Sequence, residues 1–168
     1  GAVLIATEDD AYITMRNSDL STADANIDPV DSVFASNSAR GSVFKNCTVT
    51  GRFGGSPFDL ASQAGAFSGV GRGTELSIQQ TQLRNVSFQM GRNTSHFEPM
   101  MAIVAIGQNS VAFLDHVRFA GNTLSPLSIS HNGTAMLSST VFEDNVDCHG
   151  RPTAILEATA EILADATM

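Results

Sequence analysis

The chain has 168 residues, a formal net charge of −8 and 42% hydrophobic residues. This length is typical of one domain, residues 1–168, and the acidic balance argues against nucleic acid as a partner. Only 15% of the residues are charged, and this low charge together with the apolar content excludes an intrinsically disordered chain. No stretch reaches the roughly 20 apolar residues that a membrane-spanning helix needs.

The first predicted element is a short apolar strand at residues 2–6, followed by an acidic turn at residues 8–10 and the first copy of a six-residue pattern. The first and sixth positions of this pattern are apolar, the third is small and polar, and the fourth is small or β-branched. Its six copies begin at Met15, Phe44, Leu83, Leu114, Leu137 and Leu163. The copies start roughly 23 to 39 residues apart, and periods of this size are typical of repeat architectures.

Within each copy, apolar and polar residues alternate with a period of two, which indicates strands rather than helices. The alternation changes phase at the third position, so we predict a sharp bend between two short strands. Asn suits such a bend because its short amide tolerates left-handed backbone angles. The predicted bend residues are Asn17, Asn46, Asn85, His116, Ser139 and Asp165. The three at 17, 46 and 85 are expected to stack with buried side chains.

A further strand is predicted upstream of most copies, separated from the pattern by turn signals. These strands are expected at residues 2–6, 33–35, 66–70, 102–106, 127–130 and 153–157. The segment from Thr50 to Gly65 contains Gly-Gly and Ser-Pro, and we expect a long loop there. One unit cannot bury its apolar face alone, so neighbouring units must stack. The expected core includes Leu83, Phe88, Leu114, Val117, Phe119, Leu137 and Phe142.

Three short strands per unit, stacked in parallel about 4.8 Å apart, predict an all-β fold, a right-handed parallel β-helix (a solenoid) of about six coils. On the units Leu83–Phe88 and Leu114–Asn122, the chain resembles the pectate-lyase-like superfamily and the β-helix repeats of bacterial and algal surface proteins. The resemblance covers nearly the whole chain. It implies a fold but no particular activity, because that superfamily contains enzymes, adhesins and inert scaffolds. The alternatives are a β-sandwich or a propeller, against which the constancy of the six-residue pattern argues.

Neither a disulfide nor a metal site is expected. Cys47 and Cys148 lie three units apart, about 14 Å along such a stack, whereas a disulfide needs Cα atoms within about 7 Å. Asp147, Cys148 and His149 are three adjacent donors with no second cluster at ligand spacing. We therefore expect a surface turn at residues 147–149, with no metal and no cofactor.

Four Asn-x-Ser/Thr triplets begin at Asn46, Asn85, Asn93 and Asn132, and each is a potential site of N-glycosylation. Asn46 and Asn85 are expected to be buried bend residues that carry no glycan. Asn93 and Asn132 lie in expected loops and are the candidate acceptors. The triplets favour a location outside the cell, at the cell surface or in an organelle lumen.

Two outward rows are the candidate binding surfaces. Arg16, Lys45 and Arg84 occupy the second position of the pattern, with Asp115 next in the row. The resemblance implies that such a row could bind acidic polysaccharide, since lyases and epimerases of that superfamily bind acidic sugars along one sheet. Those enzymes use clustered Asp beside the cations, and that cluster is missing here, so no general base can be assigned.

The second row consists of apolar residues, with Phe113, Met136 and Ile162 as its large members. A contiguous apolar patch marks a partner or a covering loop. Leu163 and Met168 belong to a last unit with no cap, so the chain is expected to be an excerpt or to be capped by other protein subunits. These features predict a non-catalytic scaffold subunit of a larger assembly or cell-surface structure. The alternative is an acidic-polysaccharide-binding or polysaccharide-modifying module.

Overall fold

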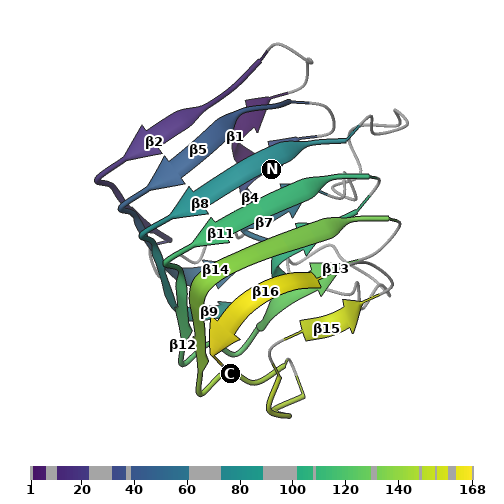
Figure 1. Cartoon of the computed structure of the whole chain (residues 1–168). Coiled ribbons are helices and arrows are strands. Elements are labelled where there is room, and N and C mark those ends of the chain that lie inside the picture. The colour runs from purple at the N-terminus through teal and green to yellow at the C-terminus, as the bar shows by residue number, and fades with distance from the viewer. Residues whose placement is uncertain are drawn as a thin grey trace, which may run out of the picture.

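The computed structural model describes residues 2–6, 11–22, 32–36, 39–60, 73–88, 102–107, 109–129, 132–147, 149–153, 155–158 and 162–167. These residues form strands, turns and irregular segments, with no helix among them (Figure 1). The strands belong to two sheets, and within each sheet every pair of neighbouring strands is parallel. The predicted all-β, parallel architecture is therefore confirmed.

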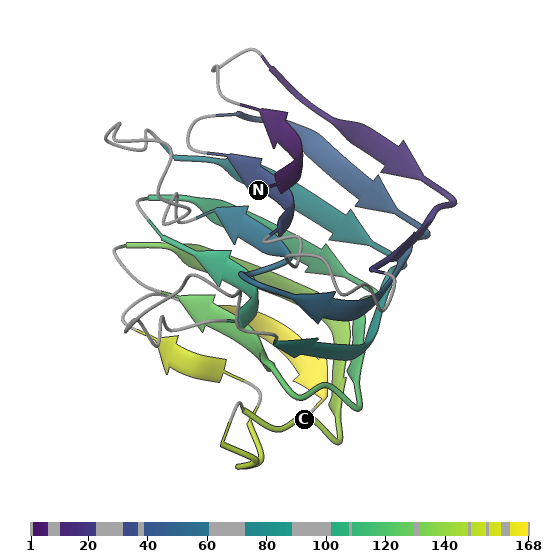
Figure 2. The same cartoon turned by 180° about the vertical axis from the view of Figure 1, so that it is seen from behind.

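The smaller sheet has six strands, which Figure 2 shows running from purple β1 to yellow β15. In spatial order they are β1 (Ala2–Ala6), β4 (Ser32–Ser36), β7 (Phe58–Leu60), β10 (Ala102–Ile106), β13 (Ser125–Ile129) and β15 (Ile155–Ala158). The strands β10 and β13 are buried along their whole length. Strands buried on both faces are expected where a parallel sheet is covered on both sides.

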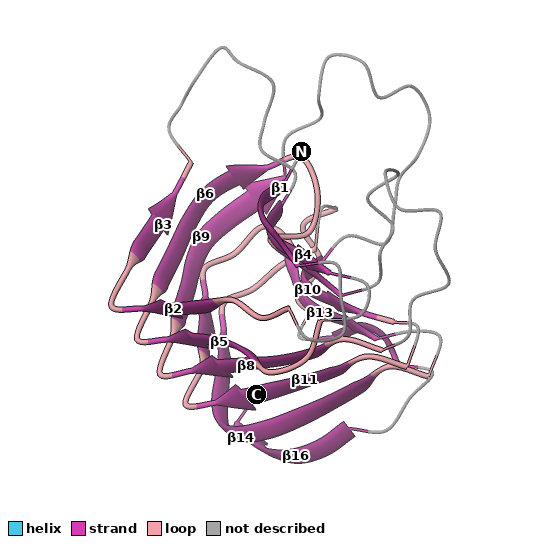
Figure 3. Ribbon diagram, turned by 90° about the horizontal axis from the view of Figure 1, so that it is seen from above, coloured by secondary structure: helices cyan, strands magenta, loops and turns pink. Residues whose placement is uncertain are grey.

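The larger sheet has ten strands and curls into two arms (Figure 3). The first arm contains β2 (Thr14–Arg16), β5 (Ser42–Lys45), β8 (Glu75–Gln79), β11 (Val111–Asp115) and β16 (Ile162–Thr167). The second arm contains β3 (Asp19–Ser21), β6 (Thr48–Phe53), β9 (Gln82–Phe88) and β12 (Arg118–Ala120). The ten-residue strand β14 (Thr134–Glu143) belongs to both arms, because it pairs with β11 before Ser139 and with β12 after it.

The first bend lies where predicted and is built from left-handed residues. Asn17, Asn46, His116 and Ser139 have φ angles of 51°, 53°, 53° and 48°. The remaining member of this column is Gln80, with φ of 48°, because β8 pairs with β5 and β11 in register. Asn46 Nδ2 donates a hydrogen bond to Asn17 Oδ1 at 2.7 Å, but both side chains are exposed. The expected stacking of Asn17 and Asn46 is thus confirmed, while their expected burial is wrong.

A second left-handed bend follows on the other arm, and it contains Asn85. Asn85, Gly121 and Asp144 have φ angles of 52°, 61° and 52°, and the strands before them are in register. The assignment of Leu83–Phe88 to the first bend is therefore wrong. The physical reason is that both bends need a left-handed residue flanked by inward apolar residues, so one pattern describes either bend.

Two further expectations about register and loops are corrected by the strand pairing. Leu163 pairs with Met136, and Asp165 with Ser138, so the last copy is shifted by one residue from its expected position. The expected loop after Thr50 contains the end of β6 and all of β7, where Phe53 and Phe58 are buried. Burial of these two rings explains why this Gly-rich segment still forms strands. The expected strand at 66–70 lies outside the described residues.

The core lies between the two sheets and is rich in phenylalanine. Phe34 packs edge-on against Phe44, whose ring does the same against Phe58, with centroid distances of 5.6 and 5.0 Å. Phe119 stacks on Phe142 at 5.1 Å. Of the seven expected core residues, six are buried and Phe88 is half-buried against them. Edge-on and offset aromatic pairs of this kind add to the free energy gained from burial.

Polar side chains at the first bend form hydrogen bonds within the bend itself, and that of Thr140 also bonds the neighbouring strand. The residue after the first bend bonds the carbonyl group two residues earlier in four cases: Ser18, Cys47, Thr81 and Thr140. Thr140 also donates to the Leu114 carbonyl group on the neighbouring strand, at 3.1 Å. Among the described residues, every buried side-chain nitrogen or oxygen atom has a hydrogen-bond partner. Such pairing offsets the cost of burying polar groups.

Candidate functional site

The predicted basic row is shorter than expected and changes sign along the first arm. Arg16 pairs with Lys45, and Lys45 with Gln79, which stands where Arg84 was expected. Asp115 follows on β11. Its Oδ1 atom lies 2.8 Å from His116 Nδ1. The hydrogen bond from His116 lowers the pKa of Asp115, assisted by Ser138 and by the charge of Lys45. This row is therefore a mixed surface rather than a continuous cationic track.

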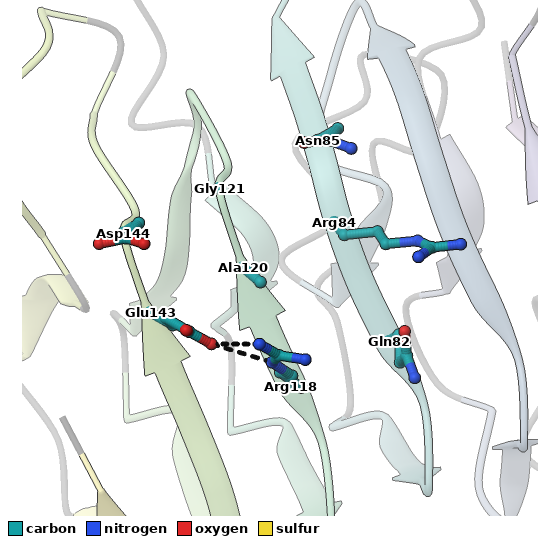
Figure 4. Close-up of a pocket in the computed structure, with 8 residues that line it drawn as sticks. All are labelled: Gln82, Arg84, Asn85, Arg118, Ala120, Gly121, Glu143 and Asp144. Carbon is teal, nitrogen blue, oxygen red and sulfur yellow. Dashed lines mark hydrogen bonds and ion pairs between the residues drawn. The ribbon is translucent and has the colours of Figure 1, made fainter.

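Arg84 lies on the second arm instead, beside an open hollow of about 290 Å³. The residues lining the hollow are Gln82, Arg84, Asn85, Arg118, Ala120, Gly121, Glu143 and Asp144 (Figure 4). The hollow follows from the register, because Arg84, Ala120 and Glu143 lie side by side on β9, β12 and β14. Ala120 and Gly121 are small, so the middle strand leaves space between two strands that carry long side chains.

The two arginines of the hollow differ in their partners. Arg118 donates from Nε and Nη2 to the same Glu143 oxygen, at 3.0 and 2.5 Å. Both side chains are about half exposed, so the pair contributes at most about 1 kcal/mol to stability. Arg84 is exposed and points away from this pair (Figure 4), and within the described residues it forms no ion pair. Arg84 is therefore the cation with unused hydrogen-bonding capacity at this surface.

The expected turn at residues 147–149 is organised by a buried carboxylate. Asp147 Oδ1 accepts hydrogen bonds from the backbone N–H groups of His149 and Arg151, at 2.8 and 2.9 Å. Its Oδ2 atom accepts from the Arg151 side chain at 2.7 Å. The Arg151 N–H group is the largest cause of a pKa of Asp147 below its usual value of 3.8. The carboxylate closes the turn, and Cys148 lies outside the described residues.

This turn should lose its stabilisation in acid. Because the folded-state pKa is lowered, the ionised carboxylate stabilises the fold above the unfolded-state pKa near 3.8. That contribution is lost as the pH falls through the folded-state pKa. We expect Asp147→Asn to lower the melting temperature at pH 7 and to lower it less below about pH 3. Asp144→Asn, on an exposed carboxyl group, is the control; an equal effect of both variants would contradict this role for Asp147.

The structure describes the side chains of only some of the predicted partner-interface residues. Phe113 is exposed to 39% and pairs with the half-buried Met136. Leu163, rather than Ile162, occupies the next position of this row, because Ile162 pairs with Ala135. Met168 lies outside the described residues. The expected apolar row therefore includes Phe113 and Met136, but Ser77 and Val43 precede them in register.

The sequons are more exposed than the sequence predicted. Asn132 is exposed, as expected, whereas Asn93 lies outside the described residues. Asn46 and Asn85 are also exposed, so the expectation that burial excludes a glycan there is wrong. The physical reason is that a left-handed corner points its side chain outward. Cys47, one residue after such a corner, is a buried free thiol.

Comparisons with known proteins give no family for this chain. No family model, curated protein or solved structure matches it. In the described part of the chain, no helix is long and apolar enough to cross a membrane. No three His, Cys, Asp or Glu side chains in that part gather as metal ligands would.

Proposed function

We propose that the chain is a right-handed parallel β-helix that serves as a non-catalytic structural scaffold. The observation that carries this proposal is the use of inward polar side chains to join neighbouring strands. Asn122 Nδ2 donates to Asn145 Oδ1 at 2.7 Å, and Asn145 Nδ2 donates to the Phe119 carbonyl group at 3.0 Å. Both asparagines are buried. These groups stabilise the stack itself, which is what a scaffold requires.

Three of the described carboxyl groups, those of Asp115, Glu143 and Asp147, support a non-catalytic role. A general acid or base works best with a pKa near the operating pH, which for a carboxyl group means a raised value. The pKa values of Asp115 and Asp147 are both shifted downward. Glu143 is held by Arg118. These carboxylates suit hydrogen bonding and charge pairing better than proton transfer.

The scaffold would act within a larger assembly through other protein subunits. Phe113 and Met136 support this part of the proposal, because an exposed aromatic ring lies beside a half-buried Met on adjacent strands. Apolar neighbours of this kind favour a protein partner. The four sequons favour a location outside the cell, at its surface or in an organelle lumen.

The second candidate function is binding of an acidic polysaccharide, with or without its modification. The specific observation in its favour is Arg84, which has no ion pair within the described residues and lies beside the hollow. A guanidinium group can bind a sugar carboxylate through two parallel hydrogen bonds. Gln82 and Asn85 line the same hollow and offer amide groups to hydroxyl oxygens.

One experiment separates these functions. The unglycosylated chain is incubated at low salt with polygalacturonate, alginate, hyaluronate and chondroitin sulfate. Binding is measured by calorimetry, and cleavage by the ultraviolet absorbance of unsaturated products. For a scaffold we expect neither binding nor cleavage, and cleavage of any polymer would overturn the non-catalytic proposal.

The same measurement tests the second candidate with matched variants. If the hollow binds polysaccharide, Arg84→Gln should weaken binding about tenfold, the equivalent of one lost interaction of about 1.4 kcal/mol. Added salt should weaken it further. Arg16→Gln, on the exposed end of the other arm, is the control and should have little effect. Equal losses in the two variants would place binding elsewhere than the hollow.

A further inference from the structure

The sequon Asn85-Val86-Ser87 lies at the second bend, on the rim of the hollow. Asn85 is exposed, with φ of 52°, while Val86 is fully buried and Ser87 is half-buried. The buried Val86 fixes the backbone, so the Asn85 side chain is directed outward by the left-handed corner. The asparagine of this sequon is therefore accessible in the folded chain.

The surroundings of the Asn85 amide leave room for a bulky group. Gly121 stands next to Asn85, where an added Cβ atom would already be in van der Waals contact with Asn85 Oδ1, at 3.4 Å. The lack of a side chain at Gly121 therefore keeps this side of the amide open. Ala120, the last residue of β12, precedes Gly121, so two small residues lie beside the Asn85 amide (Figure 4). Within the described residues the Asn85 side chain makes no hydrogen bond, whereas the Asn46 amide donates to Asn17. Substitution of the Asn85 amide nitrogen would break no contact among these residues.

We propose that Asn85 is an acceptor for an N-linked glycan whose first sugar lies over the hollow. The donor is a lipid-linked oligosaccharide diphosphate. The Asn85 amide nitrogen forms a bond to the sugar C1 atom, the bond from C1 to the diphosphate oxygen breaks, and the amide loses one proton. The lipid diphosphate leaves. The substituted nitrogen keeps one hydrogen atom. The sugar hydroxyl groups would then lie near Gln82 and the Arg118–Glu143 pair, which line the same hollow.

Glycosylation of Asn85 would affect the second candidate function. A glycan on Asn85 would cover the surface that Arg84 and Gln82 offer to a polysaccharide. The glycosylated chain would then be unable to bind an external polysaccharide at the hollow. For that reason the binding experiment above uses unglycosylated chain, and failure of either proposal can be recognised separately.

The test is site-specific mass spectrometry of chain secreted from cultured eukaryotic cells behind a signal peptide. Glycans are released enzymatically from the intact chain in ¹⁸O-labelled water, so that each modified Asn becomes labelled Asp. Trypsin then separates residues 85–92 from the sequon at Asn93, because it cleaves after Arg84 and after Arg92. We expect labelled Asp at position 85 in the wild-type chain.

Two variants of Ser87 complete the test while leaving Asn85 in place. Ser87→Ala removes the sequon and should abolish the label at position 85, whereas Ser87→Thr keeps the sequon and should retain it. The label at Asn132 reports that each variant entered the secretory route. An unmodified Asn85 in secreted wild-type and Ser87→Thr chains would overturn the proposal, and so would a label that persists in Ser87→Ala.

Discussion

Phe119→Ala should lower the free energy of unfolding by about 3–5 kcal/mol, the range for removing a buried aromatic ring. Phe119 is fully buried and stacks on Phe142 at 5.1 Å. Its neighbour in the sheet, Leu83, is also fully buried, so the surrounding strands cannot close the cavity without moving the backbone. Urea unfolding followed by circular dichroism measures the change.

Phe113→Ala is the matched control, because it removes a phenyl ring from the outward face of β11, the strand that precedes β12 in the chain. Phe113 is 39% exposed, so we expect a loss of about 1 kcal/mol or less. Losses of equal size in the two variants would contradict the inward position of Phe119 and the register of β9, β12 and β14.

Asn122→Ala should be nearly as damaging, although it removes a polar side chain. Asn122 Oδ1 accepts from the Val86 N–H group at 2.9 Å, and Nδ2 donates to the Leu83 carbonyl group at 2.9 Å and to Asn145. The variant removes all three of these buried hydrogen bonds, although Asn145 Oδ1 keeps the backbone N–H group of residue 122 as a donor at 3.3 Å. Each buried group left unsatisfied costs about 1–3 kcal/mol. We expect a total loss of at least about 3 kcal/mol in the same unfolding assay.

Asn85→Gly is the control for Asn122→Ala. Asn85 is exposed and left-handed, and Gly adopts positive φ without steric cost, so the expected loss is below about 1 kcal/mol. If Asn122→Ala proved as mild as Asn85→Gly, the buried pair of Asn122 and Asn145 would not be holding the strands together.

The sequence predicted the strands and the first bend because both leave a local signal. Alternation of apolar residues marks strands, and Asn at a fixed place in the pattern marks a left-handed corner; Asn17 and Asn46 have that conformation. Gln80 was missed because Gln is uncommon at positive φ, and the nearby Asn85 fitted the pattern better. The copy at Leu83 was therefore matched to the wrong bend.

The candidate site is harder to predict from the sequence than the strands are, because it depends on the register between strands that are distant in the chain. Arg84, Ala120 and Glu143 are neighbours only after β9, β12 and β14 pair, and no local pattern encodes that pairing. The buried asparagines did leave a signal. Asn122 and Asn145 each stand eight residues after the first position of a copy, at Leu114 and Leu137. A shared polar residue at that spacing would have predicted an inward ladder.

The two left-handed bends set a fixed length of chain between them. The pairs are Gln80 and Asn85, His116 and Gly121, and Ser139 and Asp144. In every pair the positions differ by five, although the segments between successive passes vary in length. Insertion of one residue between the bends would turn inward side chains outward. We therefore expect the chain to accept length changes more readily in the segments between successive copies of the bends than in the five-residue step from the first bend to the second.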